Sequence, residues 1–358
     1  MAKKYPLVEI IILHHSGLDI IKNCLNSLRK NKYSNLRITV VDQKSEDGSR
    51  EMIKNKYKEV NLFVNNENDS FAKANNKILK RSKAKYCILL NDDTEHDPNW
   101  ILKLVECAEK DKNAGALQPK VLSLKNKRMF EYAGAAGGFI DKYGYPLCRG
   151  RIFGKVEKDN GQYNYPSEIF WSCGVAMLIN MDVIRKIGYL DEDIGSYGEE
   201  LDLCWRMHLA GYKILYSHES RIYHLGSGTW GQNKLKLKKE YMIHRNHWIL
   251  LFKNYSKSSW LGVIPMKFIL ESATFCAFLL STPRKSLAIL TTYGWILSHI
   301  GMLLRKNKDV EKLRKVDDSE IKNKMLPFSI GLRYFLGDKN KTFRDYENKL
   351  NYAPFKKI

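Results

Sequence analysis

Two short acidic segments carry the residue types that could do chemistry in this chain. In the first, Asn91, Asp92 and Asp93 follow directly on the apolar run at 86–90. A buried strand delivers side chains to its carboxyl end, where open α/β sheets bind their ligands. Carboxylates there suit Mg²⁺ or Mn²⁺, which take oxygen ligands and commonly share them with substrate phosphates. An acidic surface turn would show the same residues, because Asp and Asn are ordinary turn residues.

The second acidic pair, Glu199 and Glu200, follows Gly198 where a helical pattern begins. Side chains in this first turn would point into the cleft above the helix, where a carboxylate can act as a general base. Compensation of the helix dipole is the simpler explanation, because negative charge is favoured at a helix start. Asp202 and Arg206 stand four residues apart, so we expect them to pair along the helix.

A sheet must position both segments, and the chain before residue 120 has the pattern of one. Short apolar runs alternate there with amphipathic segments. The expected strands are 7–13, 37–41, 60–64, 86–90 and 114–119, and the expected helices lie near 18–30, 49–57, 70–82 and 98–110. This alternation predicts an α/β fold with a mostly parallel, doubly wound sheet. A less regular, glycine-rich segment leads to further apolar runs at 175–179 and 213–216.

Composition narrows the class of protein. The chain has 358 residues, 44% of them hydrophobic, which predicts about two domains with packed cores. Its seven cysteines are odd in number and lack paired metal-ligand spacing, so we expect neither disulfides nor zinc. The apolar stretch 7–13 contains Glu9 and is too short for a signal peptide, so we expect an intracellular chain. A net charge of +21 indicates an anionic partner.

The distribution of basic residues favours a membrane surface as that partner. They are densest at 234–239 and from 305 onward, on either side of the most apolar part of the chain. Basic flanks of this kind attract anionic lipid. A merely soluble, lysine-rich surface is the alternative.

Between these basic flanks lie two apolar segments. Residues 260–281 are interrupted by Pro265, Lys267 and Glu271, whereas 286–304 contains no Asp, Glu, Lys or Arg and is long enough to span a bilayer. Basic residues at both of its ends do not orient a single crossing. We therefore expect a helical hairpin that lies in the membrane interface or re-enters it, with a true span or a buried helical core as the alternatives.

Four motifs in register resemble the family-two inverting glycosyltransferases, particularly their rhamnosyltransferase-like branch. The motifs are VVDQKSEDGS (40–49), FAKANN (71–76), LLNDDT (89–94) and GEELDLCWR (198–206). The resemblance covers about residues 5–235 and rests on the order and spacing of all four motifs. It implies a nucleotide-sugar-binding GT-A fold.

The resemblance implies donor-binding roles for seven residues: His14, Asp42, Asp47, Asn75, Asn91, Asp92 and Trp171. Asp42 is similar to the aspartate that accepts a hydrogen bond from the donor base, and His14 ends the first strand, where the family lines the base pocket. Asp47 matches a position near the nucleoside, although the turn at Gly48 alone would explain it. Trp171 would stack on a sugar ring or belong to the ordinary core.

The same resemblance implies a divalent metal, Mn²⁺ or Mg²⁺, held by Asp93 and His224. Residues 91–93 resemble the family's Asp-x-Asp motif with Asn91 in first place. Asn91 lacks the charge but still accepts a hydrogen bond from ribose or from a metal-bound water. Asp93 is therefore the expected direct ligand, and the role of Asp92 stays open. The neutral imidazole of His224 is a competent ligand for Mn²⁺.

The family usually has Glu-Asp where this chain has Glu199 and Glu200. Glu200 is similar to the base, so it is our first choice for that role and Glu199 is the alternative. The base would remove the acceptor hydroxyl proton during attack opposite the leaving diphosphate. Inversion at the anomeric carbon follows.

These features together predict a metal-dependent inverting glycosyltransferase at the cytoplasmic face of the cell membrane. It would move a sugar, with rhamnose as one candidate, from a UDP- or dTDP-linked donor to a glycan or lipid-linked acceptor in cell-surface polysaccharide synthesis. Residues 1–235 would form the catalytic domain and 236–358 the helical, membrane-associated region.

Two other functional classes share part of this pattern. Metal-dependent nucleotidyl transfer could use the same sheet and carboxylates, whereas nucleic-acid binding rests on charge alone, so no nucleic-acid partner is expected. Residues 226–231 formally match a dinucleotide fingerprint, but they lie outside a βαβ unit. We expect a glycine-rich loop over the donor there.

Overall fold

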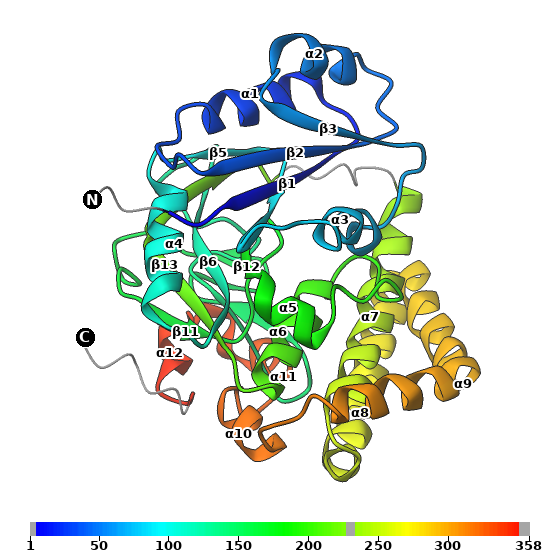
Figure 1. The fold of residues 1–358 in the computed structure, drawn as a ribbon. Helices are drawn as coiled ribbons and strands as arrows, with labels where there is room; N and C mark the ends of the chain where they lie inside the picture. Colours follow the sequence, from blue (N-terminus) through cyan, green and yellow to red (C-terminus); the bar gives the residue numbers. More distant parts are fainter. Residues whose placement is uncertain (1–4, 227–232, 351–358) are drawn as a thin grey trace.

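A nine-stranded sheet forms the centre of the computed structural model, which describes residues 5–226 and 233–350 (Figure 1). Its strands are β1 (Val8–His14), β2 (Leu36–Gln43), β3 (Val60–Asn65), β4 (Tyr86–Asn91), β5 (Thr94–His96), β6 (Ala114–Ser123), β11 (Ser167–Ile169), β12 (Ala176–Asn180) and β13 (Lys213–His224). The order is β11-β13-β6-β12-β4-β1-β2-β3, and β5 pairs with β13.

Six of these nine strands run in one direction. β3, β2, β1 and β4 are mutually parallel, and β12 lies antiparallel between β4 and β6. This reversal leaves β6 and β13, which are parallel to each other, running the same way as β4. The carboxyl ends of all six therefore meet at one edge of the sheet. The predicted mostly parallel sheet is confirmed.

The helices of this half also lie where the apolar periodicity predicts them. They are α1 (Leu18–Leu28), α2 (Ser49–Lys56), α3 (Phe71–Leu79) and α4 (Trp100–Lys110). β1 and β4 are buried along almost their whole length, which explains why both are continuous apolar runs without alternation. Ser70 begins α3 by accepting a hydrogen bond from the Lys73 backbone N–H.

The glycine-rich segment forms a second, four-stranded sheet that the sequence did not predict. It has the order β10-β9-β8-β7 and consists of β7 (Gly138–Ile140), β8 (Pro146–Cys148), β9 (Arg151–Ile152) and β10 (Lys155–Val156). Strands of two or three residues are too short to show a periodic pattern. The chain then passes through α5 (Met181–Ile187) to α6 (Glu199–Leu209), the helix that carries the second acidic pair.

Three long helices follow and pack beside the sheet domain (Figure 1). They are α7 (Asn233–Asn254), α8 (Lys257–Ser281) and α9 (Pro283–Glu311), and shorter helices complete the described chain: α10 (Asp318–Asn323), α11 (Ile330–Leu336), η1 (Asp338–Asn340) and α12 (Arg344–Glu347). α7 contacts α6, α8 and α9. By length and composition alone, α8 and α9 could each cross a membrane.

The charged residues that interrupt the apolar run of α8 face the protein. Lys267 and Glu271 are fully buried, with Lys267 Nζ 2.6 Å from Glu271 Oε1 and His244 Nδ1 of α7 2.7 Å from Glu271 Oε2. Large apolar side chains cover the outer surface of the hairpin that α8 and α9 form, including Leu280, 89% exposed, and Leu297, 79% exposed. The hairpin therefore buries its charged residues against the protein and exposes large apolar side chains on its outer surface.

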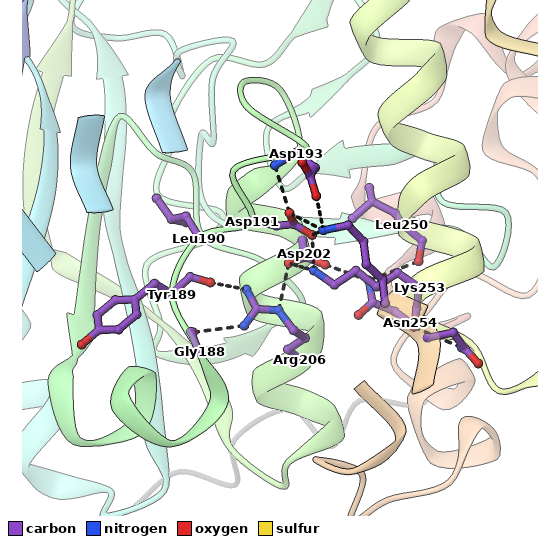
Figure 2. Close-up of polar contacts among 12 residues, drawn as sticks. Gly188, Tyr189, Leu190, Asp191, Asp193, Asp202, Arg206, Leu250, Lys253 and Asn254 are labelled. Atoms are coloured by element: carbon purple, nitrogen blue, oxygen red, sulfur yellow. Dashed lines mark hydrogen bonds and ion pairs between the residues drawn. The ribbon is translucent and has the colours of Figure 1, made fainter. Parts of the chain in front are cut away.

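A buried ion network joins these helices to α6 (Figure 2). Lys253 of α7 lies 2.7 Å from an Asp191 carboxylate oxygen and 2.8 Å from one of Asp202. Asp202 also pairs with Arg206 at 2.8 Å, as the four-residue spacing predicts, and Lys306 of α9 lies 2.7 Å from Asp191. The network fixes α6 from both sides.

Replacement of Lys253 by methionine tests this network. The change leaves the fully buried Asp202 with Arg206 as its one remaining ion-pair partner among the described residues, and breaking a buried ion pair is strongly destabilising. We expect a loss of about 3 kcal/mol in the free energy of unfolding, measured by urea denaturation. Lys312→Met, which breaks the exposed pair with Asp309, is the control and should change little. Equal effects of the two variants would contradict the structural role of the network.

Candidate active site

The candidate site lies at the edge where the parallel strands end. Asn91 ends β4, and the chain turns so that β5 pairs with the end of β13. This pairing aligns Thr94 with His224, and the Leu225 backbone N–H donates to the Asp93 carbonyl over 3.0 Å. The short strand β5, which the sequence did not reveal, therefore brings the two predicted metal ligands together.

His224 lies between two carboxylates. Its Nε2 is 3.0 Å from Asp93 Oδ1, and its Nδ1 is 3.0 Å from Glu131 Oε2. Burial lowers the pKa of His224, but hydrogen bonds to Asp93 and Glu131 outweigh it and raise that pKa to about 9. Glu131 is a residue that sequence reasoning missed. It belongs to the irregular segment, matches no motif, and reaches His224 only through the fold.

Asp92 is held by His14, which comes from the neighbouring strand β1. His14 Nδ1 lies 2.7 Å from Asp92 Oδ2. Burial raises the pKa of Asp92, and the hydrogen bond to His14 opposes this rise without cancelling it. His14 Nε2 is buried and has no hydrogen-bond partner in the described chain. The structure thus brings His14 to the acidic strand end, where its Nδ1 contacts Asp92 and its Nε2 can still bind a ligand.

Asp42 and Asp47 hold turns at the ends of β1 and β2. Asp42 accepts hydrogen bonds from the Ser45 backbone N–H and from Arg50 Nε, over 3.2 and 2.7 Å. Asp47 Oδ2 accepts from the Gly17 backbone N–H over 2.6 Å. Burial raises the pKa of Asp47, but hydrogen bonds from Ser49 and Gly17 prevail and lower it to about 2. These contacts give Asp47 a structural role, and contact with a nucleoside stays a prediction.

Asn75 and Trp171 are buried away from these contacts. Asn75 Nδ2 donates to the Phe71 carbonyl over 2.9 Å, while its Oδ1 has no hydrogen-bond partner among the described residues. Trp171 Nε1 donates to the Phe139 carbonyl over 2.9 Å, and its ring lies against Gly138. Trp171 has the contacts of a core residue, so its stacking on a sugar stays a prediction.

Glu199 and Glu200 open α6 after a tight turn. Tyr197 and Gly198 have φ angles of 70° and 109°, a left-handed geometry that glycine adopts without strain. Burial raises the pKa of both carboxyls, most strongly that of Glu199. A hydrogen bond within the pair further raises the pKa of Glu199 and lowers that of Glu200. The pKa of Glu199 is therefore raised further than that of Glu200, so Glu200 is the member of the pair that ionises more readily.

The turn before Glu199 is held by α7. Asn246 is fully buried, and its Nδ2 lies 2.8 Å from both the Ser196 and Tyr197 carbonyl oxygens. The adjacent Arg245 donates to the Ile194 carbonyl over 2.9 Å. The C-terminal helices therefore position the acidic pair. Sequence reasoning missed Asn246, because no motif in the adjacent sequence indicates a contact with residues about fifty positions earlier.

The site thus combines a carboxylate and imidazole pair at one strand end with an acidic pair at a helix start. Such an arrangement suits stabilisation of a charged leaving group and removal of a proton. Of the predicted loop at 226–231, Gly226 has a φ of 62° and the rest lies outside the described residues.

Comparison with known proteins identifies the class that this fold and site define. The family model for glycosyl transferase family 2 matches residues 9–188, half of the chain. The chain therefore belongs to glycosyl transferase family 2, and it is a glycosyltransferase with a GT-A fold.

Similar proteins include an uncharacterised glycosyltransferase from Rickettsia prowazekii, 27% identical over 66% of this chain and 74% of its own length. The poly-beta-1,6-N-acetyl-D-glucosamine synthase of Staphylococcus aureus is 26% identical over 63% of this chain and 51% of its own length. The chain spans only 28% of another relative, an uncharacterised protein from Sinorhizobium fredii that is 23% identical over 68% of this chain.

Two solved structures share the fold. GalNAc-T7 with UDP, GalNAc and Mn²⁺ superposes with a TM-score of 0.55 at 17% identity, over 71% of this chain and 49% of that one. The mannosyltransferase PcManGT from Pyrobaculum calidifontis with GDP-Man and Mn²⁺ gives a TM-score of 0.50 at 12% identity, over 87% and 86% of the two chains.

Proposed function

We propose that this glycosyltransferase uses a divalent metal to transfer a sugar, with inversion, from a UDP- or dTDP-linked donor to a glycan or lipid-linked acceptor. The observation that carries the proposal is the convergence of Asp93 and His224 at the strand end, in a fold that also carries Glu200 in the first turn of α6. Rhamnose stays one candidate sugar, and cell-surface polysaccharide synthesis is the proposed setting. The similar synthase from Staphylococcus aureus makes a polysaccharide, which supports that setting.

The side chains at the strand end fit a hard divalent ion. Asp93 Oδ1 and His224 Nε2 lie 3.0 Å apart, so the two atoms are close enough to bind one ion together. Among the described residues, no three His, Cys, Asp or Glu side chains are arranged to hold a metal by themselves. One or two protein ligands are enough for an ion that shares its coordination with phosphates. The two solved neighbours both contain Mn²⁺, which supports a divalent metal here.

Each group then has a defined task. Asp93 and His224 would hold the metal, which supplies positive charge to the leaving diphosphate when bound. Glu131 would fix the His224 ring through Nδ1, as carboxylates commonly do for metal-binding histidines. Glu200 would accept the acceptor hydroxyl proton, and a protonated Glu199 would keep Glu200 ionised by donating to it.

The hairpin of α8 and α9 is proposed to hold the enzyme at the cytoplasmic face of a membrane. Its exposed apolar side chains would enter the lipid interface, while its buried polar face stays on the protein. The net charge of +21 favours anionic lipid, because each well-placed Lys or Arg near such a surface contributes about 1 kcal/mol. This placement would present the active site to a lipid-linked acceptor.

Removal of one metal ligand should abolish metal-dependent donor binding. We expect Asp93→Asn to lose Mn²⁺-dependent UDP binding, measured by calorimetry, and Glu131→Gln to weaken the apparent metal affinity by about 10- to 100-fold. Asp97→Asn, a carboxylate just after β5, should behave as the parent protein. Full Mn²⁺-dependent UDP binding by a folded Asp93→Asn variant would rule out this metal site.

The acidic pair is separable by substitution. Glu200→Gln should lower kcat by at least about 100-fold with donor binding intact, because the base is gone. Glu199→Gln should retain much more activity, since its amide can still donate to Glu200. Because the pKa of Glu200 is raised, kcat of the parent should climb with pH through a value above the ordinary 4.5. The reverse ranking of the two variants would transfer the base role to Glu199.

The membrane role can be measured by flotation with liposomes. We expect the parent to float with vesicles containing phosphatidylglycerol and less with phosphatidylcholine alone. The double variant Leu280→Glu and Leu297→Glu should remain in the pellet, because both side chains lose their apolar contact with lipid. Val64→Glu, on the exposed edge of β3, is the matched control. Equal flotation of the double variant and the control would contradict the hairpin as the anchor.

A further inference from the structure

One buried cation in the four-stranded sheet has no carboxylate partner. Arg151 of β9 is 6% exposed, yet no Asp or Glu in the described residues lies within 4.0 Å of it. Its Nη1 donates to the Phe153 carbonyl over 3.2 Å, its Nη2 reaches Cys148 Sγ at 3.3 Å, and its Nε has no partner. Arginine is almost never buried in this way unless it is paired.

The other buried cations of this region are paired. Arg149 contacts Glu347 at 3.0 Å, and Lys120 contacts Asp159 at 2.6 Å. Both therefore satisfy the expectation that a charge removed from water has a counter-ion. Arg151 is the exception among the three, although Arg149 stands only two residues away.

Arg151 is linked to the carboxylate beside His224 through one residue, Tyr132. Its guanidinium carbon is 4.5 Å from the ring centroid of Tyr132, which is 56% exposed and directly follows Glu131 in the chain. Glu131 in turn contacts His224 at 3.0 Å.

The position of Arg151 separates it from the nucleoside side of the site. His14 and Asp42 end β1 and β2, on one side of β4. Glu131 instead bonds to β6 through its backbone N–H and the Val121 carbonyl, on the other side of β4. Through its contact with Tyr132, Arg151 is therefore linked to the side of β4 opposite His14 and Asp42.

We propose that Arg151, with Tyr132 above it, forms an oxyanion subsite that binds a phosphate group of the acceptor. This inference rests on the proposed function, because it names the acceptor chemistry of the same site. Guanidinium binds phosphate through parallel hydrogen bonds, and the phosphate would be the counter-ion that Arg151 lacks. Tyr132 adds an apolar wall beside the anion. A lipid-linked acceptor attached through phosphate has the required chemistry, and a donor diphosphate is the competing source.

The test uses phenyl phosphate as the probe and the full chain saturated with UDP and Mn²⁺. Calorimetry should detect binding of the probe to this complex, at least a tenfold weakening in Arg151→Gln, and partial retention in Arg151→Lys. Arg149→Gln is the control, because it removes a neighbouring buried guanidinium that already has Glu347. Binding to the parent only when UDP is absent would assign Arg151 to the donor diphosphate and overturn the acceptor subsite.

Stability provides a second measurement. If Arg151 served the fold alone, Arg151→Gln would lower the melting temperature as Arg149→Gln does and leave probe binding unchanged, which would overturn the proposal. We expect instead an unchanged or higher melting temperature for Arg151→Gln. The substitution removes a buried charge that has no counter-ion, and with it the desolvation cost of that charge. Probe affinity equal to the parent in Arg151→Gln, or no binding by the parent, also overturns it. UDP and Mn²⁺ binding, measured in every variant, reports separately on the proposed function.

Discussion

The architecture of the site depends on one electrostatic constraint, which is that the half-buried carboxylates at the end of β4 need partners. Asp92 takes His14 from β1, on one side of β4, and Asp93 takes His224 from β13, on the other side. The first pair needs only the parallel pairing of β1 with β4. The second pair depends on the antiparallel strand β12 between β4 and β6, because that reversal brings the ends of β6 and β13 to the same edge as the end of β4. The order of the strands therefore determines which side chains meet at the site.

The C-terminal helices complete this site as well as covering the domain. Asn246 holds the turn before Glu199, and Lys253 neutralises Asp202 one turn further along α6. Lys306 of α9 reaches the same network through Asp191. The hairpin with the exposed apolar surface thus shares a buried ion network with the helix of the proposed base. The exposed apolar surface and the acidic pair are therefore connected through buried contacts.

The sequence predicted what depends on local pattern and failed where distant residues meet. Strands and helices up to residue 120 lie close to their expected ranges. The strands were predictable because a strand that is buried on both faces consists of consecutive apolar residues. The strand β5 has only three residues and shows no apolar run, although it brings Asp93 close to His224. Glu131 and Arg151 belong to no sequence motif. Their roles depend on tertiary contacts, which for Glu131 is the contact with His224 and for Arg151 is the lack of a carboxylate partner among the described residues. Lys267 interrupts an apolar run in the sequence, whereas in the fold it turns inward.

Motif matches alone do not separate residues that shape the fold from residues that meet substrate, but hydrogen-bonding capacity helps to do so. Within the described chain, both oxygens of Asp47 accept hydrogen bonds from backbone N–H groups, those of Gly17 and Ser49. By contrast, a buried polar atom without a partner remains on His14, Asn75, Glu199 and Glu200. Leaving such an atom unpaired costs about 1–3 kcal/mol. Several core tryptophans also leave their indole N–H unpaired, so the criterion has meaning only where motif and position agree. Four predicted site residues meet it together, which is what a site built for a polar ligand requires.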